Sequence, residues 1–180
     1  MKIIKIGLKN KTAKNLFNVF ESNLKKSDKT IVDILSKFKK EDYLQYPILF
    51  DLIVHKKTKI LENLFKMGVL FTYQDAVGAN ALHVACGISG DLEIVKLLTR
   101  NKILNDINAK TDEGETPFLL AIMYNHSGIV RYFLQNFEPD LSMRTIFGET
   151  AFSIAQKNNN LEMLILLEAA KSGKNIDEFR

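Results

Sequence analysis

Cys86 and His83 are the residues whose types and spacing could support nucleophilic catalysis. They are three residues apart in a stretch that we expect to be helical, so they would be near neighbours. A thiol beside an imidazole is the start of a hydrolase site, which also needs a third group that orients the imidazole. The chain has no other such pairing. A thiol that is buried, with no electropositive and exposed setting, is inert.

The other residue types used in chemistry form no recognisable site. His55, His83 and His126 stand in three separate parts of the chain, and no ligand cluster has metal-site spacing. The glycines are spread singly, so there is no phosphate-binding loop. Three carboxylates in the range 112–115 form an acidic cluster, which we expect to be solvated. We predict no metal, no cofactor, no catalytic residues and no small-molecule substrate.

A short motif recurs along the chain, and its clear copies begin at Gly78, Gly114 and Gly148. These starts are 36 and 34 residues apart, and a weaker copy lies at residues 46–52. A second apolar run follows each start at a matching distance, at 60–65, 94–98, 129–134 and 163–167. A fixed period of this length is typical of repeat proteins, in which each repeat is one supersecondary unit.

Each repeat predicts a short helix, a tight turn, a second helix and a polar connector. Glycine and asparagine in the turns suit positive-φ positions at helix ends. Stacking of the helix pairs would join their apolar faces into one core. We predict these core residues: Leu82, Ala85, Ile94, Val95, Leu97, Leu98, Phe118, Ala121, Ile129, Val130, Phe133 and Leu134.

Residues 75–110 resemble the ankyrin repeat, which has a period of about 33 and a Thr-Pro-Leu-His-x-Ala core. The corresponding residues are Ala81-Leu82-His83-Val84-Ala85 here and Thr116-Pro117 in the next copy. The resemblance is strong over about 70–168, moderate over 43–69 and absent before about residue 42. It implies an all-α ankyrin-repeat solenoid with four repeats, at 43–73, 74–110, 111–143 and 144–171. The segment 101–106 is about two residues long for its connector.

The resemblance also implies that the protein is a binding protein and not an enzyme. Cys86 stands where the family has a small buried alanine, and His83 where it has a structural histidine. Partners of the family are expected on a concave face, which the hairpin tips and the exposed positions of the first helices form. The partner-binding residues implied are Tyr73, Gln74, Asp75, Val77, Ile88, Lys110, Asp112, Glu113, Met123, Tyr124, Arg144, Thr145, Phe147 and Lys157.

Five of these residues are the preferred anchors, because their types are enriched at interfaces. They are Tyr73, Met123, Tyr124, Arg144 and Phe147. An alternative for Ile146 and Phe147 is that they pack on the neighbouring tip. The segment 106–109 is similar to the family segment whose asparagine is hydroxylated in animal cells. Asn108 is therefore a candidate acceptor, although the same residues are the plain structural consensus.

The two ends of the chain differ from the repeats. Residues 1–42 predict a basic N-terminal cap with two helices, at 12–24 and 29–39. Residues 1–40 carry eleven lysines and three acidic residues. This excess is either a solvated surface or, as an alternative function, a binding site for lipid headgroups or nucleic acid. The last repeat is expected to be a C-terminal cap, followed by a charged tail at 172–180.

The leading functional hypothesis is an adaptor or inhibitor that binds another protein and has no catalytic activity. The chain lacks a signal-peptide core and any stretch of about 18 apolar residues. Its single cysteine is easily accommodated in a reducing compartment. We expect a cytoplasmic monomer, or an effector delivered into a host cell by a route without such a signal. The lysine- and asparagine-rich composition resembles that of the host-directed ankyrin proteins of intracellular bacteria and viruses.

Overall fold

The computed structural model describes residues 18–19, 22–23, 26–37, 48–69, 73–100 and 106–176 of the chain. The chain divides into two compact units, Met1–Tyr73 (unit 1) and Gln74–Arg180 (unit 2), and each is described here by itself. In the described ranges all regular structure is helical, which confirms the predicted all-α class. Within the same ranges no helix is long and apolar enough to cross a membrane.

Unit 1 contains the helices α2 (Asp28–Leu35), α3 (Ile48–Val54) and α4 (Thr58–Lys66). Helix α4 packs against both of the others, and the contacts bury Ile31 and Leu61 among other side chains. Helix α2 begins at its cap residue Ser27 and ends earlier than the predicted residue 39, because residues 36–37 form a turn. Of the predicted helix 12–24, residues 18, 19, 22 and 23 are described and helical, and the others lie outside the described residues.

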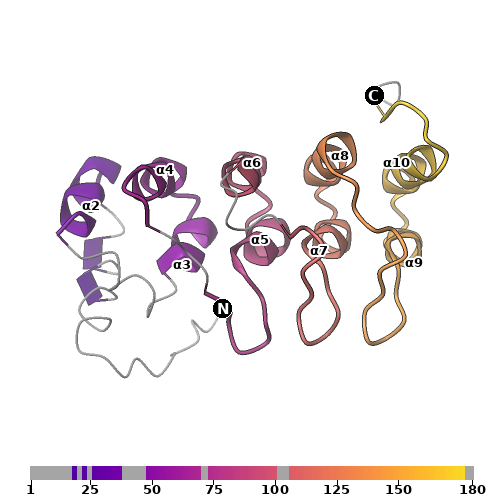
Figure 1. Ribbon diagram of the computed structural model, residues 1–180, viewed down its shortest axis with the longest axis horizontal. Coiled ribbons are helices and arrows are strands. Elements are labelled where there is room, and N and C mark those ends of the chain that lie inside the picture. Colours follow the sequence, from indigo (N-terminus) through magenta and orange to yellow (C-terminus); the bar gives the residue numbers. More distant parts are fainter. Residues whose placement is uncertain are drawn as a thin grey trace. The chain divides into compact units, whose positions relative to one another are not determined.

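In its described residues unit 2 contains three helix pairs. Figure 1 shows them side by side with their connecting loops on a common side. Their bounds are α5 (Ala81–Val84) with the π-helical turn η2 (Ala85–Ser89), α6 (Leu92–Arg100), α7 (Pro117–Met123), α8 (Ser127–Asn136), α9 (Ala151–Lys157) and α10 (Leu161–Lys171). The first helices form one layer, in which α7 contacts η2 and α9, and the second helices α6, α8 and α10 form another.

Capping residues start the first helix of each pair in the same way. The side chains of Asn80, Thr116 and Thr150 each accept a hydrogen bond from the backbone N–H three residues later. This bond satisfies one of the free N–H groups at a helix start. The turn between the two helices contains a positive φ, at Asn125 (59°) and Asn159 (52°), as the predicted turns require.

The core of unit 2 lies between the two helix layers and agrees largely with the predicted residues. Leu82, Val95, Phe118 and Phe133 are almost completely buried. Two predicted core residues, Leu97 and Leu134, are only half-buried. The predicted set included neighbouring apolar residues such as Leu97 and Leu98 together, whereas the buried positions of a packed helix form a stripe on one side.

The first repeat of unit 2 has one extra residue in its first helix. The cap residues of its two helices, Asn80 and Asp91, are eleven positions apart, whereas the corresponding residues Thr116 and His126 are ten apart. The extra residue is accommodated as the π turn η2, in which Gly90 N–H donates to the Ala85 carbonyl at 3.0 Å. This repeat is two residues longer than the next one. One of the two extra residues lies in η2 and only the other falls after α6, so assigning both to the segment 101–106 was wrong.

Candidate partner-binding surface

Three hairpin tips project from unit 2, at residues 74–79, 110–115 and 144–149 (the three tips). Each is closed by a backbone bond of 3.0 Å, from Asp75 N to Ala79 O, from Thr111 N to Glu115 O and from Thr145 N to Glu149 O. Each also contains a glycine with φ between 74° and 76°. A positive φ of this size is easily adopted only by glycine, which explains why a glycine recurs in the motif.

Backbone hydrogen bonds also join each tip to the next. Asp112 N–H donates to the Val77 carbonyl, and Ile146 N–H donates to the Glu113 carbonyl, both at 2.9 Å. These two bonds form a ladder that runs across the tips in the direction in which the repeats stack. The bonds that join one tip to the next therefore involve backbone atoms alone.

The side chains of two predicted binding residues stabilise the tips themselves. The Asp75 carboxylate accepts from the backbone N–H groups of Val77 (3.0 Å) and Ala79 (2.8 Å). The Thr145 hydroxyl accepts from Phe147 N–H and Glu149 N–H, and Thr145 is only 5% exposed. The predicted role of Thr145 as a binding residue does not fit this burial, because its hydroxyl closes the tip from inside.

Several apolar side chains on the tips and on the adjoining ends of the first helices are exposed. Phe147 is 73% exposed and Tyr124 is 57% exposed, and Val77, Ile88 and Ile146 are exposed as well. Ile146 and Phe147 therefore do not pack on a neighbouring tip, which was the alternative for them. Large side chains held by a fixed backbone are typical anchors of protein interfaces, because little freedom is lost when they bind.

The charged residues of the three tips are mainly acidic. Asp112 and Glu113 are exposed, whereas Glu115 and Glu149 are half-buried. Burial, together with the nearby carboxylates of Glu113 and Glu149, raises the pKa of Glu115. Lys110 is exposed in the middle tip, and Arg144 donates to the Gly148 carbonyl of the last tip at 3.2 Å.

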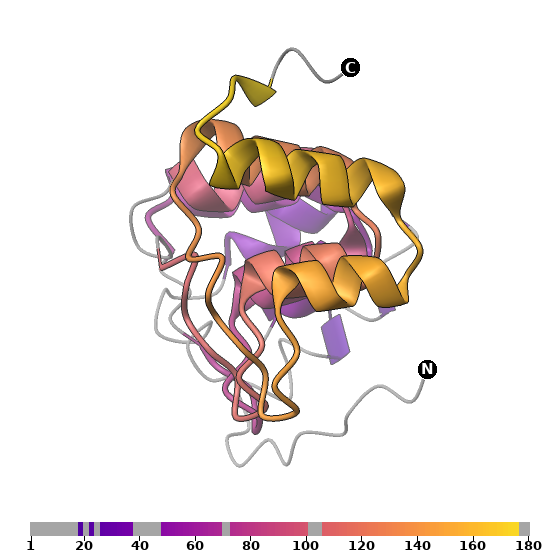
Figure 2. The same cartoon turned by 90° about the vertical axis from the view of Figure 1, so that its right-hand side faces the viewer.

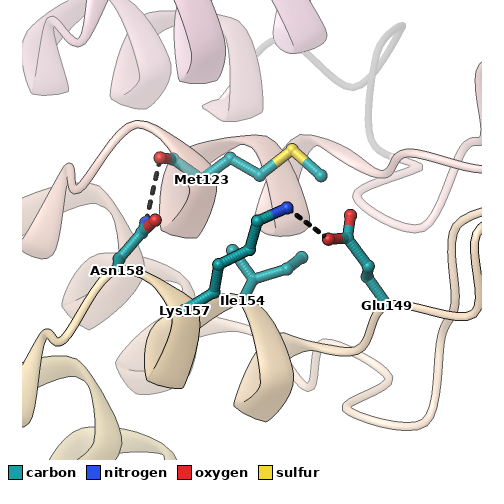
Figure 3. A pocket seen from close by; sticks show the side chains of 5 residues that line it. All are labelled: Met123, Glu149, Ile154, Lys157 and Asn158. Carbon is teal, nitrogen blue, oxygen red and sulfur yellow. Dashed lines mark hydrogen bonds and ion pairs between the residues drawn. The ribbon is translucent and has the colours of Figure 1, made fainter.

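A shallow hollow of about 210 Å³ lies between α7 and α9, the first helices of the last two pairs. Figure 3 shows its lining, in which Lys157 Nζ pairs with the Glu149 carboxylate at 2.8 Å and the Met123 side chain lies opposite. Asn158 Nδ2 donates to the carbonyls of Ile122 and Met123, so it caps the end of α7. Met123 and Lys157 were predicted, whereas Glu149, Ile154 and Asn158 were missed. Eight residues separate Glu149 from Lys157 across a change of element, and no sequence periodicity connects such a pair.

The other residues that the sequence analysis singled out lie in different parts of the chain. Gln74 is exposed in unit 2. Tyr73 belongs to unit 1, where its half-buried ring meets Phe50 edge-on with 5.4 Å between ring centroids. The Asn108 side chain accepts from Asp140 N–H at 3.2 Å, which fits the structural consensus role of this asparagine. Of the lysines in 1–40, Lys26, Lys29 and Lys37 are described and exposed, and the others lie outside the described residues.

The pair Cys86 and His83 does not form a catalytic site. Cys86 is fully buried, and burial raises the pKa of its thiol well above the usual value. The His83 ring is engaged elsewhere, since Nε2–H donates to the carbonyls of Ala109 (3.1 Å) and Glu115 (3.2 Å) and Nδ1 accepts from Asn80 N–H. Among the described residues, no three His, Cys, Asp or Glu side chains are grouped as metal ligands.

His126 supports the π turn of the repeat before it. Its Nε2–H donates to the Gly87 carbonyl at 3.1 Å, and its ring stacks on Tyr124 at an interplanar angle of 12°. The ring also occupies the space in which a side chain at Gly90 would lie. His126 thus has a structural role, because it joins α8 to η2 of the preceding repeat.

Comparisons with known proteins agree with this geometry. The family model of ankyrin repeats (3 copies) matches residues 27–144 and 82–178. A putative ankyrin repeat protein of Rickettsia bellii (strain RML369-C) is 49% identical over 74 residues, which are 41% of this chain and 62% of that protein. Neurogenic locus notch homolog protein 2 of Homo sapiens and of Mus musculus is 28% identical over 124 residues, which are 68% of this chain and 5% of those proteins.

The chain therefore spans less than two thirds of each of these relatives. The family match begins at residue 27 and includes α2, so the resemblance extends further towards the N-terminus than residue 42, where the recognisable motifs stop. The repeated motif, the helix pairs and a family match over most of the sequence lead to one conclusion. The chain belongs to the ankyrin-repeat family, whose members are generally non-catalytic protein–protein interaction modules.

Proposed function

We propose that unit 2 binds a partner protein through the three tips and the adjoining exposed ends of the first helices, and that the protein acts as an adaptor or inhibitor. The observation that carries the proposal is the set of exposed apolar side chains on a frame fixed by backbone bonds. Phe147 and Ile146 stand on the last tip, Val77 on the first, and Ile88 and Tyr124 on the first helices.

The charges of the tips indicate the character of the partner. Carboxylates of Asp112 and Glu113 are exposed beside these apolar residues. A partner segment with an apolar anchor and flanking basic residues would complement this surface and would approach faster at low salt. Association without the basic residues would leave the carboxylates facing an unmatched surface.

We further propose that the binding takes place inside a host cell. The support is the short, lysine- and asparagine-rich ankyrin chain and the 49% identical relative from Rickettsia bellii. The partner in this proposal is a host protein. As an inhibitor, the chain competes with the normal partners of that protein, and as an adaptor it links that protein to another one.

Proximity labelling in host cells with the full chain and two surface variants tests the function. Phe147→Lys and Ile88→Lys place a charge at two separate points of the surface and leave the backbone bonds in place. We expect the proteins labelled by the wild type to be reduced about tenfold or more with each variant, as for interface anchors. Leu161→Glu, on another side of unit 2, is the control and should retain them.

The melting temperature of each variant is measured in parallel, so that a loss through unfolding is recognised. If both folded surface variants label the same proteins as the wild type, the tips and the first helices are not the binding surface.

A further inference from the structure

The hollow between α7 and α9 has an apolar lining and a carboxylate at its rim. Met123 and the nearly buried Ile154 supply the apolar part, and Glu149, the last residue of the third tip, supplies the carboxylate. Figure 2 shows the three tips extending past α9 on the side away from α10. The hollow therefore adjoins the surface to which the proposed function assigns the partner.

The size and lining of the hollow suit one long side chain. Its volume of about 210 Å³ is below the range of roughly 300–1,000 Å³ that is typical of small-molecule pockets. Side chains with an apolar stem and a charged end cover apolar surface with the stem and bring the end to a polar group. Met123 and Ile154 can receive such a stem, and Glu149 can receive a cationic end.

Negative charge accumulates on this side of the last two tips. Burial and then the carboxylates of Glu113 and Glu149 raise the pKa of Glu115, so the three acidic groups lie close enough to interact. Of the residues that line the hollow, Lys157 carries the positive charge, and its Nζ pairs with Glu149 at 2.8 Å. One lysine thus faces three carboxylates, and a further cation would be attracted here.

The two other basic residues of these tips are placed differently. Lys110 acts on the Asp140 carboxylate. Arg144 donates to the Gly148 carbonyl within its own tip. Neither is among the charges that act on Glu115. The negative charge beside the hollow is therefore left for a group that another molecule supplies.

The ion pair at the rim is one that a partner can exchange. The Lys157 side chain is 74% exposed, whereas that of Glu149 is 25% exposed. A pair of this exposure contributes little to stability, so the lysine can turn into the solvent at small cost. A guanidinium that replaces it gains geometry, because its planar fork can bond both carboxylate oxygens at once.

Other side chains fit the hollow less well. An apolar side chain would remove water from the pair of Glu149 and Lys157 without adding a bond, which is unfavourable. An acidic side chain would be repelled by the carboxylates. A second lysine would only repeat the point-charge contact that Lys157 already makes.

We propose that this hollow binds an arginine side chain of the partner. The guanidinium takes the place of Lys157 Nζ on the Glu149 carboxylate, and the arginine methylene groups pack on Met123 and Ile154. The flexible thioether of Met123 adapts to the stem that it contacts. This role rests on the proposed function, and it specifies one of the basic residues that the partner supplies.

Titration of the full chain with two peptide pools tests the arginine site, with the isotope-labelled methionine methyl groups followed by NMR. The peptides of each pool have varied residues around a fixed centre, which is arginine in one pool and citrulline, its uncharged isostere, in the other. We expect the Met123 methyl signal to shift with the arginine pool. The citrulline pool should need about tenfold higher concentration or more for the same shift.

Variants of the two members of the ion pair should change the affinity in opposite directions. Glu149→Gln should weaken binding of the arginine pool about tenfold or more, whereas Lys157→Gln removes the competing cation and should strengthen it about twofold. Damage to the fold would weaken binding in both variants. Glu162→Gln removes the same charge from a carboxylate that pairs with Arg131 of α8, and this control should bind like the wild type.

A Met123 signal that stays in place at millimolar arginine pool overturns the proposal. An equal response to the citrulline pool, an unchanged affinity in Glu149→Gln or a weaker one in Lys157→Gln also overturns it. Labelling of host proteins by the Phe147→Lys and Ile88→Lys variants is a separate readout. If those variants lose their partners while the peptides do not bind, the proposed function stands and the arginine site is rejected. If they keep their partners while the peptides bind, the proposed surface is rejected instead.

Discussion

The buried imidazole of His83 joins two repeats of unit 2. Its Nε2–H donates to the carbonyls of Ala109 and Glu115 on the two sides of the middle tip, while Nδ1 accepts from the cap residue Asn80. Burial is the largest effect on its protonation and lowers the pKa of His83 below 6.5. The neutral ring is therefore the form that burial favours in the folded chain.

Stability is expected to fall in mild acid because of His83. Well above pH 6.5 the ring is neutral in both the folded and the unfolded chain, so its contribution is complete. As the pH falls below 6.5, the unfolded chain takes up a proton that the folded chain resists, and the free energy of unfolding decreases until the lowered pKa is passed. His83→Leu should remove this part of the pH dependence, and urea unfolding at pH 7.5 and at lower pH measures it.

The same variant should cost about 1–3 kcal/mol at pH 7.5, because two carbonyls lose their shared donor. Leucine is a suitable replacement, since Leu119 holds the equivalent position in the next repeat. The wild type measured under the same conditions is the reference. An unchanged slope in His83→Leu would assign the pH dependence to other groups.

The turn after η2 depends on close contact between two repeats. Gly90 has φ of 61°, and a Cβ there would overlap the His126 ring. Gly87, three residues earlier, has no positive φ, and a Cβ there would be 3.6 Å from Leu120 and Tyr124, which is ordinary contact. Position 87 can therefore accept a residue with a Cβ, whereas position 90 cannot do so without displacing His126, although the two glycines lie in the same turn of the chain.

We expect Gly90→Ala to lower the melting temperature clearly and Gly87→Ala to leave it unchanged or raise it. The first variant has both an unfavourable φ and a displaced His126, whereas the second replaces a helical glycine by a residue with about 1 kcal/mol better helix propensity. Thermal unfolding followed by circular dichroism compares the pair. Equal effects of the two variants would contradict the role given to His126.

The sequence was sufficient to predict the elements of unit 2, because capping residues, turn glycines and paired apolar runs recur at a constant spacing. It was not sufficient for the position of the extra residue in η2. A helix can take up an added residue as a π turn without any change in residue types, so spacing alone does not distinguish this from a longer loop.

The exposure of the residues proposed for binding was predictable only in part, for a physical reason that Thr145 illustrates. A threonine in a tip can face a partner or can turn its hydroxyl back to the backbone, and both suit the same sequence. Phe147 was assigned correctly to an exposed tip position, but packing on a neighbour was equally consistent with the motif. The sequence pattern gave no indication for Leu161 and Ile165, which are 70% and 42% exposed.

Over its described residues, unit 2 has its own core, its own capping residues and three helix pairs. Stacked repeats are stabilised by contacts with their nearest neighbours, and about three repeats suffice for a stable array. We expect a fragment of residues 74–180 to be helical and to unfold in one cooperative thermal transition. A fragment of residues 1–73, in which α2, α3 and α4 are the described helices of a smaller unit, is the comparison and should unfold with less cooperativity.

Calorimetry or circular dichroism of the two fragments measures this. A broad, non-cooperative transition for residues 74–180 would show that unit 2 depends on the first 73 residues for its structure.

The ladder across the three tips has a consequence for how the chain can change in evolution and in the laboratory. Its bonds involve only the N–H groups of residues 112 and 146 and the carbonyls of residues 77 and 113. Any amino acid except proline can supply the N–H groups, and every amino acid supplies the carbonyls. Positions 77, 113 and 147 can therefore be randomised, with the tip glycines kept, to give a library in which binding specificity varies on a constant backbone. By the same reasoning, a lineage can acquire a new partner by a few substitutions at these codons without first losing its fold.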